Sequence, residues 1–367
     1  MLVNYGYLHQ QFAEVDNYFE ELRKWVPSGE FTLGPFVEKF EKMFADYLGV
    51  KHVISTNTGT DALILALKAS GIKSGDEVIT VTNTFYATVG AIVATGAKPV
   101  FVDCDERMQI NPDLIEQAIT RKTKGIVPVH WMGYPADMAR IMEIANQNNL
   151  VVVEDACPAV GAEIDGKRCG SFGKASGFSF HPLKPLNVWG DGGSIATNDD
   201  EMADFLRSYR NHGMTDRDHN EIWGINSRMQ PFQAIVGAKV LDTVDYSNSI
   251  RIRNAKLLDE GLKSLEGHIS IPERSSKYKD VYQLYVVRAK KRDELLNYLQ
   301  SKEIECRVHY PLPLHLQKAA HNMGHEKGDF PESEKQTEEI ITLPAHQFIK
   351  PEQIENMIES ICSFYLS

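Results

Sequence analysis

The sequence predicts an α/β fold: a large domain with a mostly parallel mixed sheet flanked by helices, followed by a smaller C-terminal α+β domain. Short Val/Ile runs alternate with helical stretches from about residue 52 to 153, a pattern typical of parallel sheets covered on both faces. A chain of 367 residues also exceeds one typical core. From about residue 266 this alternation stops, which indicates a second, smaller unit.

The expected elements follow in order along the chain. Residues 1–26 carry acidic residues spread among apolar ones, which favours an amphipathic helix over a signal peptide. Buried strands are predicted at residues 53–55, 77–81, 99–102, 125–129 and 150–153, with helices at 61–69, 86–95, 112–118 and 136–146. A strand at 194–197, a helix at 201–210 and a long linking helix at 231–262 come next. The small domain holds strands at 281–287 and 305–309 and helices at 292–301 and 351–365.

We place the large domain at residues 1–250 and the small domain at 251–367. Net charge is -11 without a long basic block, which argues against nucleic acid or an anionic membrane as a partner. No apolar run is long enough to cross a bilayer. The five cysteines are scattered and form no CxxC pair, so we expect reduced thiols in a cytoplasmic protein and no bound metal.

Residues 177–193 carry the strongest functional signal. Lys184 lies in a turn between two apolar runs, with Ser179 five residues before it and a glycine cluster after it. Upstream, a buried strand ends at Asp155. A positioned lysine and a strand-end aspartate are what a pyridoxal 5'-phosphate enzyme needs, because the lysine forms the Schiff base and the aspartate keeps the ring nitrogen protonated. The alternatives are a surface lysine and an aspartate that caps a helix.

Other candidate residues lie near predicted strand ends. Residues 57–63 follow a strand and open a helix at Thr60 and Asp61, an arrangement that suits phosphate but also an ordinary capped helix. Phe85 follows another strand and is a candidate to stack on a cofactor ring or to join the core. Ser179 is a candidate phosphate ligand, and His181 a structural or substrate residue in the same turn.

The proline-rich loop at residues 309–315 contains His309, Tyr310 and His315. Rigid loops of this kind often line substrate sites. The rival is a zinc site, which the spacing supports poorly because no cysteine or carboxylate ligand lies nearby.

In combination and order, these motifs resemble the DegT-type sugar aminotransferases, a branch of the fold-type I pyridoxal phosphate enzymes in the aspartate aminotransferase superfamily. The resemblance covers nearly the whole chain. The matching segments are residues 33–41, 58–63, 75–79, 84–85, 128–133, 154–156, 177–193, 224–229 and 309–311.

The resemblance implies a role for each matching residue. Lys184 is the Schiff-base lysine and proton shuttle, and Asp155 pairs with the ring nitrogen. Phe85 stacks on the ring. The remaining implied roles are phosphate binding by the backbone of Thr60 and Asp61, by Ser179 and by Asn226 of a neighbouring subunit with Arg228 beside it. Apart from these roles, we expect His309, Tyr310 and His181 to contact the substrate. The resemblance therefore also implies a homodimer with two shared sites.

Two positions depart from the common family pattern. Pro158 stands where many relatives have Gln or His, so the usual hydrogen bond to the cofactor's phenolic oxygen is missing or comes from another group. The glycine cluster contains Asp191 where many relatives have Glu. Together with His309 and Tyr310, this favours 3-keto over 4-keto sugars.

The resemblance implies an aminotransferase that moves an amino group from L-glutamate to a keto sugar. We expect the sugar to be nucleotide-linked, and its product to supply amino sugars for a surface polysaccharide or a secondary metabolite. A keto-sugar phosphate is an alternative acceptor. One rival is a sugar dehydratase of the same fold, a group whose members replace the lysine with histidine. The others are a cofactor-binding sensor without turnover and a nucleotide-binding Rossmann protein, whose phosphate fingerprint is missing here.

Overall fold

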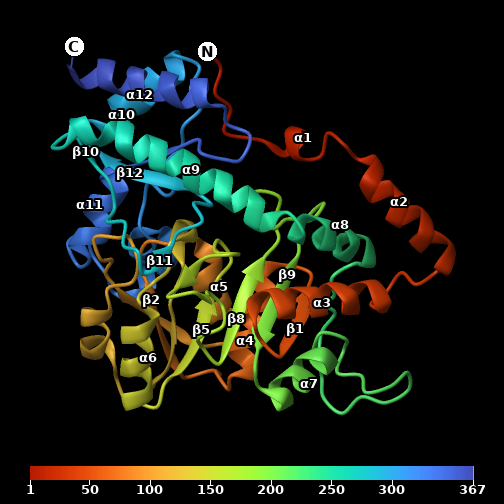
Figure 1. The fold of residues 1–367 in the computed structure, drawn as a ribbon. Coiled ribbons are helices and arrows are strands. Elements are labelled where there is room, and N and C mark those ends of the chain that lie inside the picture. Colours follow the sequence, from red (N-terminus) through yellow and green to blue (C-terminus); the bar gives the residue numbers. More distant parts are fainter. Residues whose placement is uncertain (367) are drawn as a thin grey trace.

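The structure, a computed structural model, describes residues 1–366 and is built around a seven-stranded sheet (Figure 1). The strand order is β1-β9-β8-β5-β4-β2-β3. β9 runs antiparallel to β1 and β8, and the other neighbours are parallel. The predicted α/β class and mostly parallel sheet are therefore confirmed. The strands are β1 (His52–Thr56), β2 (Glu77–Val81), β3 (Lys98–Val102), β4 (Thr123–Val127), β5 (Val151–Asp155), β8 (Ala175–Ser179) and β9 (Gly193–Thr197).

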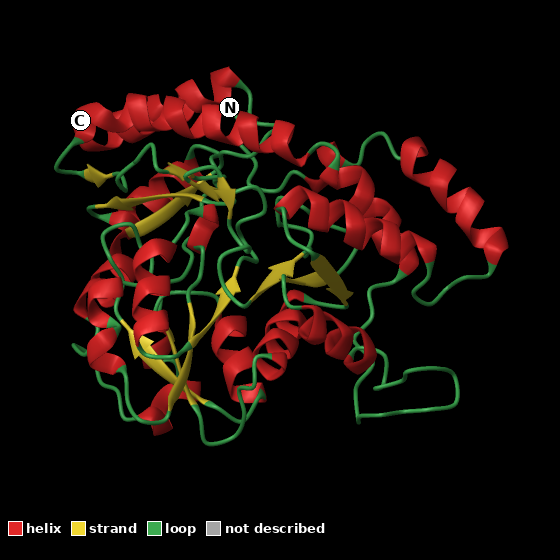
Figure 2. Cartoon of the chain, turned by 60° about the horizontal axis from the view of Figure 1, so that its bottom comes forward, coloured by secondary structure: helices red, strands yellow, loops and turns green. Residues whose placement is uncertain are grey.

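Helices enclose this sheet, as the turned view in Figure 2 shows. Several begin at a side chain that accepts a backbone N–H, a preferred way to start a helix: Thr58 caps α4, Asp137 caps α6 and Asp199 caps α7. The helices of this part are α1 (Leu8–Gln11), α2 (Asp16–Trp25), α3 (Pro35–Leu48), α4 (Gly59–Ala69), α5 (Tyr86–Ala94), α6 (Met138–Gln147), α7 (Asp200–Tyr209), α8 (Pro231–Leu241) and α9 (Val244–Leu262).

A second, antiparallel sheet lies in the C-terminal part of the chain. Its order is β10 (Ile269–Ser270), β12 (Tyr285–Ala289) and β13 (Ile340–Leu343). The helices here are α10 (Arg292–Ser301), α11 (Pro331–Glu339) and α12 (Pro351–Leu366). A third, minor sheet joins β11 (Tyr278–Lys279), β6 (Glu163–Ile164) and β7 (Lys167–Arg168).

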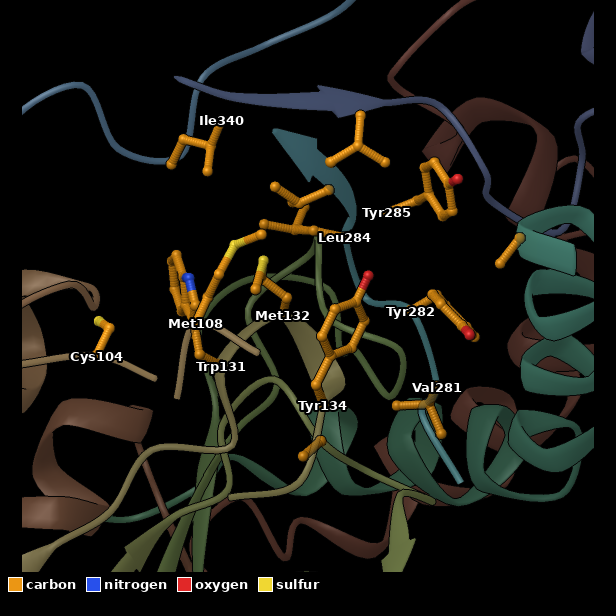
Figure 3. Packing of buried hydrophobic residues seen from close by; sticks show 14 of the residues in the cluster. Cys104, Met108, Trp131, Met132, Tyr134, Val281, Tyr282, Leu284, Tyr285 and Ile340 are labelled. Carbon is orange, nitrogen blue, oxygen red and sulfur yellow. The ribbon is translucent and has the colours of Figure 1, made fainter. Parts of the chain in front are cut away.

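The two larger sheets share one apolar core. Met132 and Tyr134 follow β4 of the large sheet, and they pack in the same cluster as Leu284 and Ile340 of the C-terminal part (Figure 3). Backbone hydrogen bonds join the same segments, from Val281 N to Gly133 O and from Leu284 N to Met132 O. The C-terminal part is thus held against the edge of the large sheet where the strands end.

The chain's first residues are also fixed in the C-terminal part. Val3 forms a parallel bridge with Ile304. Gln353 and Asn356 of α12 donate side-chain hydrogen bonds to the backbone oxygens of Leu2 and Met1. The two ends of the described chain accordingly lie on the same side of the molecule (Figure 1).

Several expected elements differ in the structure. The predicted helix at 112–118 is two short 3-10 helices, η2 (Pro112–Leu114) and η3 (Glu116–Ala118). The predicted helix at 231–262 is divided into α8 and α9 at Asp242 and Thr243, where the Thr243 hydroxyl donates a hydrogen bond to Val240 O. Residues 305–309 form no strand, although Arg307 bridges to Thr342. The helix expected in residues 1–26 is two helices, α1 and α2.

The predicted boundary between residues 250 and 251 falls within the continuous helix α9. It stays a prediction, and Ser367, the last residue of the predicted small domain, lies outside the described residues. Among residues 1–366, none of the helices combines the length and the apolar character that a membrane span requires.

Candidate active site

The predicted site residues meet where β5 and β8 end. Asp155 is the last residue of β5, and Ser179 is the last residue of the neighbouring strand β8. Lys184 lies in the turn between β8 and β9. The helices α4 and α5 begin at the same edge, after β1 and β2. In open α/β sheets, ligands bind at this carboxyl edge.

Asp155 is held by two hydrogen bonds. Its side chain is buried, and Oδ2 accepts a bond from Thr88 Oγ1 at 2.7 Å, while Oδ1 accepts one from Cys157 N at 3.2 Å. Thr88 is itself buried, on the first turns of α5. The carboxylate therefore has a fixed orientation at the strand end.

A second buried carboxylate stabilises the backbone next to Asp155. Glu154 accepts hydrogen bonds from the backbone of Gly170, Phe172 and Gly173 and from His130 Nε2. Burial works to raise the pKa of Glu154, but these donors hold the pKa below its usual value. This network fixes the end of β5, because His130 N also donates to Asp155 O.

Lys184 has the electrostatic environment of a reactive amine. Burial lowers the pKa of its ammonium group, while the nearby Cys157 and Asp155 act in the opposite direction. Its backbone is fixed by hydrogen bonds from Lys184 N to His181 O and from Asn187 Nδ2 to Lys184 O. The turn is thus rigid, and a larger share of the amine is neutral than for an exposed lysine.

The N-terminus of α4 lies directly against Ser179. A Cβ atom on Gly59 would stand 2.5 Å from Ser179 Cβ, closer than real contacts allow. The Asp61 N–H is already bonded to Thr58 Oγ1 at 3.0 Å. The N–H groups of Gly59 and Thr60 have no acceptor among residues 1–366. Two free N–H groups beside a hydroxyl form a cradle for an anion.

An aromatic group stands beside this edge. Phe85, which precedes α5, is 38% exposed, and its ring centroid lies 5.9 Å from that of Tyr310. The ring centroid of Trp131 lies 5.4 Å from that of Tyr310. His309 Nδ1 contacts Thr342 Oγ1 at 2.9 Å, and burial lowers the pKa of His309 to about 4. His309 is therefore neutral near pH 7.

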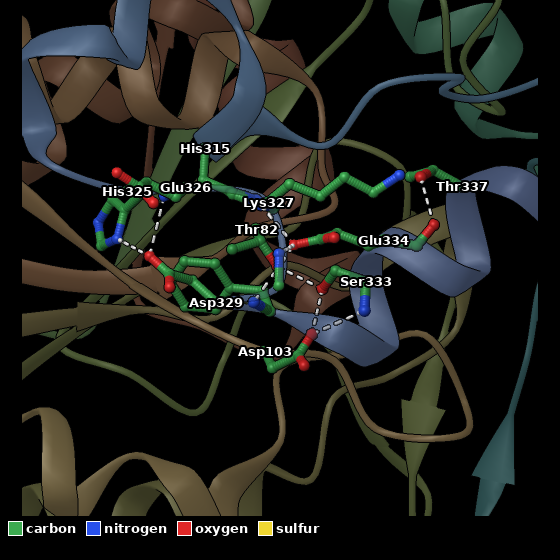
Figure 4. A network of polar contacts seen from close by, with 12 residues as sticks. Thr82, Asp103, His315, His325, Glu326, Lys327, Asp329, Ser333, Glu334 and Thr337 are labelled. Atoms are coloured by element: carbon green, nitrogen blue, oxygen red, sulfur yellow. Dashed lines mark hydrogen bonds and ion pairs between the residues drawn. The ribbon is translucent and has the colours of Figure 1, made fainter.

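The loop that carries His309 and Tyr310 is anchored to both parts of the chain. Leu314 N donates to Thr82 O at the end of β2, and His315 Nε2 contacts Glu334 Oε1 on α11 at 3.0 Å. Asp103, just after β3, accepts the backbone N–H of Glu332 and Ser333 and so caps α11. Figure 4 shows part of this network, in which the buried His315 contacts Glu334.

Other predicted residues lie at the margin. His181 is exposed, with its Nδ1 facing the backbone of Leu183. Asn226 is exposed and bridges to Asn211, whose side chain accepts a bond from Arg228 at 2.8 Å. Ser227 between them contacts Asp61 Oδ2 of the same chain at 3.1 Å. Within one chain, Asn226 and Arg228 thus lie near the cradle without closing it.

Sequence reasoning missed Gly59, Thr88 and Cys157. Thr84 Oγ1 lies 3.4 Å from Thr88 Oγ1, but nothing local in the sequence indicates that Thr88 bonds to Asp155. Among residues 1–366, no group of three or more His, Cys, Asp or Glu side chains is arranged to hold a metal ion.

The profile of the DegT/DnrJ/EryC1/StrS aminotransferase family matches residues 13–362. The chain belongs to this family. A "dTDP-3-amino-3,4,6-trideoxy-alpha-D-glucose transaminase" of Streptomyces venezuelae is 37% identical, over 95% of this chain and 94% of that protein. A "pleiotropic regulatory protein" of Geobacillus stearothermophilus is 42% identical, over 92% and 91%. The crystal structure of S. venezuelae DesV with a ketimine intermediate superposes with a TM-score of 0.96 at 36% identity, covering 99% and 98% of the two chains.

Members of the DegT/DnrJ/EryC1/StrS family depend on pyridoxal 5'-phosphate, and the residues of this site fit that group. The free N–H groups of Gly59 and Thr60 suit its phosphate. The exposed part of Phe85 offers an aromatic surface, and Asp155 a buried carboxylate. Lys184 supplies the amine that the cofactor's aldehyde requires.

Proposed function

We propose that this chain transfers the amino group of L-glutamate to the ketone of a nucleotide-linked sugar. The observation that carries the proposal is the placement of Lys184, whose pKa is lowered by burial, beside the buried Asp155. The name of the S. venezuelae relative, a 3-amino sugar nucleotide transaminase, supports a 3-keto acceptor. The product would supply a surface polysaccharide or a secondary metabolite.

Lys184 and Asp155 have complementary roles in this proposal. Bound pyridoxal phosphate supplies an electron-accepting ring. The Lys184 amine, whose pKa is lowered by burial, would hold the cofactor and would move a proton between the substrate carbon and the cofactor carbon. Asp155, oriented by Thr88 and Cys157 N, places a negative charge against the ring nitrogen and keeps that nitrogen protonated.

The remaining site residues bind and orient. Ser179 and the N–H groups of Gly59 and Thr60 hold the phosphate. The Asp61 N–H can bind the phosphate, as predicted, only if its hydrogen bond to Thr58 Oγ1 breaks. Phe85 stacks on the ring. Substrate contact is assigned to His309, Tyr310 and His181, with His309 as a neutral hydrogen-bonding group.

We further propose a homodimer in which Asn226 and Arg228 complete the partner's phosphate site. Exposed apolar side chains next to them support this: Trp223 is 91% exposed and Ile225 41%. Large exposed apolar groups of this kind are typical of interaction surfaces. A cytoplasmic location also stays a prediction, supported by five free cysteines.

A glutamate half-reaction tests the function. The purified holoenzyme, mixed with L-glutamate alone, should release one equivalent of 2-oxoglutarate per site as its cofactor spectrum shifts. The aminated enzyme should then return its amine to a nucleotide-linked 3-keto sugar. A dehydratase would release water from the sugar without net amine transfer, and failure with every amino donor would refute the proposal.

A regulatory role is a second candidate, favoured by the name of the G. stearothermophilus relative. A sensor that only binds the cofactor has no need of a fixed proton-transfer group. The half-reaction separates the two functions, because a sensor would show no stoichiometric 2-oxoglutarate.

A further inference from the structure

Arg251, in α9, is a buried cation without an acidic partner. Its residue is only 2% exposed. The other two buried arginines each pair with a carboxylate, Arg210 with Glu41 and Arg292 with Asp293. Arg251 alone among these three lacks an ion pair within residues 1–366. Because an unpaired buried charge is costly, this position calls for an anion.

The open edge of the guanidinium group has the geometry that a carboxylate requires. Nη1 donates weakly to the backbone oxygens of Tyr282 and Gln283, at 3.3 and 3.5 Å. Nε and Nη2 are buried and have no acceptor among residues 1–366. These two nitrogens share one edge of the planar group, so they can donate two parallel hydrogen bonds to both oxygens of one carboxylate.

Arg251 faces a small cavity of about 20 Å³. Tyr7 lines the same cavity, and its hydroxyl is buried and has no partner among residues 1–366. His346 also lines the cavity, and it is neutral near pH 7 because burial lowers its pKa to about 4. Among residues 1–366, no acidic side chain lines the cavity. The described part of the chain thus places a cation and a free hydroxyl here, without a negatively charged side chain that could accept their hydrogen bonds.

The cavity adjoins the proposed active site on two sides. Leu183, the residue before Lys184, lines it, and Leu183 O accepts a bond from Gln283 Nε2 at 3.3 Å. Thr342, which also lines it, holds His309. A ligand group in the cavity therefore lies beside both the lysine turn and the predicted substrate loop.

We propose that Arg251 and Tyr7 bind a carboxylate group of the amino donor. This inference rests on the proposed transaminase function. The cavity has room for about one small group, since a single water needs roughly 10–15 Å³ by the same measure. A carboxylate fits this size, whereas the diphosphate of a sugar nucleotide needs several times more space.

Glutarate, a dicarboxylate without an amine, tests the site directly. Calorimetry on the holoenzyme should show that Arg251→Met raises the Kd for glutarate about 10- to 100-fold, as expected for the loss of charged hydrogen bonds. Arg253→Met is the matched control, because Arg253 is exposed on the same helix, and it should leave the Kd unchanged. Amine transfer from the aminated enzyme to the keto sugar should change less than about threefold in Arg251→Met. An unchanged Kd, or equal loss in both half-reactions, overturns the proposal.

Tyr7→Phe keeps the test decisive if Arg251→Met does not fold. It removes a hydroxyl that has no partner within the chain, so the melting temperature should stay the same while the Kd for glutarate rises about 3- to 10-fold. An unchanged Kd in this variant overturns the proposal, as does inorganic phosphate binding at Arg251 more tightly than glutarate. If wild-type protein binds glutarate through Arg251 but never deaminates glutamate, the transaminase function fails and the carboxylate site stands. If the wild-type protein deaminates glutamate but does not bind glutarate through Arg251, the carboxylate site is refuted and the transaminase function stands.

Discussion

Replacing Gly59 by alanine should weaken both the fold and cofactor binding. The added Cβ would lie 2.5 Å from Ser179 Cβ and 2.9 Å from Ser179 Cα. Unstrained carbon contacts need about 3.5 Å or more, so α4 and the end of β8 must separate by about 1 Å. Overpacking of this kind costs about 1–3 kcal/mol of the free energy of unfolding. A Ser179 hydroxyl moved by that distance also loses its proposed bond to the phosphate, which corresponds to about a 10- to 100-fold higher Kd.

Urea unfolding of the apoprotein measures the first effect, and spectroscopic titration with pyridoxal phosphate measures the second. Gly90→Ala is the control, because a Cβ there meets nothing within 4 Å. Gly90 lies inside α5, so alanine should stabilise the protein by about 0.5–1 kcal/mol. A folded Gly59→Ala variant that binds the cofactor as tightly as wild type would refute the argument that this contact shapes the phosphate cradle.

Three further outcomes are expected. Lys184→Ala should reduce amine transfer to background in the glutamate assay, and a wild-type rate would disprove its catalytic role. Thr88→Val removes one hydrogen bond to the buried Asp155 and should lower the free energy of unfolding by about 1.5–3 kcal/mol, with Thr88→Ser restoring it in urea titrations. The pKa of His346 is lowered to about 4, so between about pH 6.5 and 4 the unfolded chain binds a proton that the folded chain does not, and stability falls as the pH is lowered. By pH 5 this proton uptake lowers the free energy of unfolding by about 2 kcal/mol. His346→Gln should abolish this loss when the free energies of unfolding at pH 7 and pH 5 are compared.

Local signals were enough to predict the strands that position the site. The apolar run ending at Asp155 and the turn at Lys184 are read from a few neighbouring residues, and both lie at the expected edge. At these two positions the hydrophobic period and the turn residues agree with the final fold. The cap of α4 differs, because it is Thr58, whereas Thr60 or Asp61 was expected.

The contacts that complete the site are long-range and carry no local signal. Thr88 meets Asp155 across 67 residues of sequence, and Asp103 caps a helix 230 residues later. The helix predicted at 231–262 is two helices, α8 and α9, and the hydrophobic pattern of these residues does not mark the break at Thr243. Arg251 gave no signal at all, since an unpaired arginine is recognised only when its surroundings are known.

The anchoring of residues 1–7 in the C-terminal part has a consequence for biosynthesis. Val3 is made about 300 residues before its bridge partner Ile304. At ribosomal speeds of about 5–20 residues per second, the leading segment must wait roughly 15–60 s for the surface it docks on. A nascent chain that stalls before this point leaves Tyr7 without the wall of its cavity, so this part of the molecule closes only after His346 has been made.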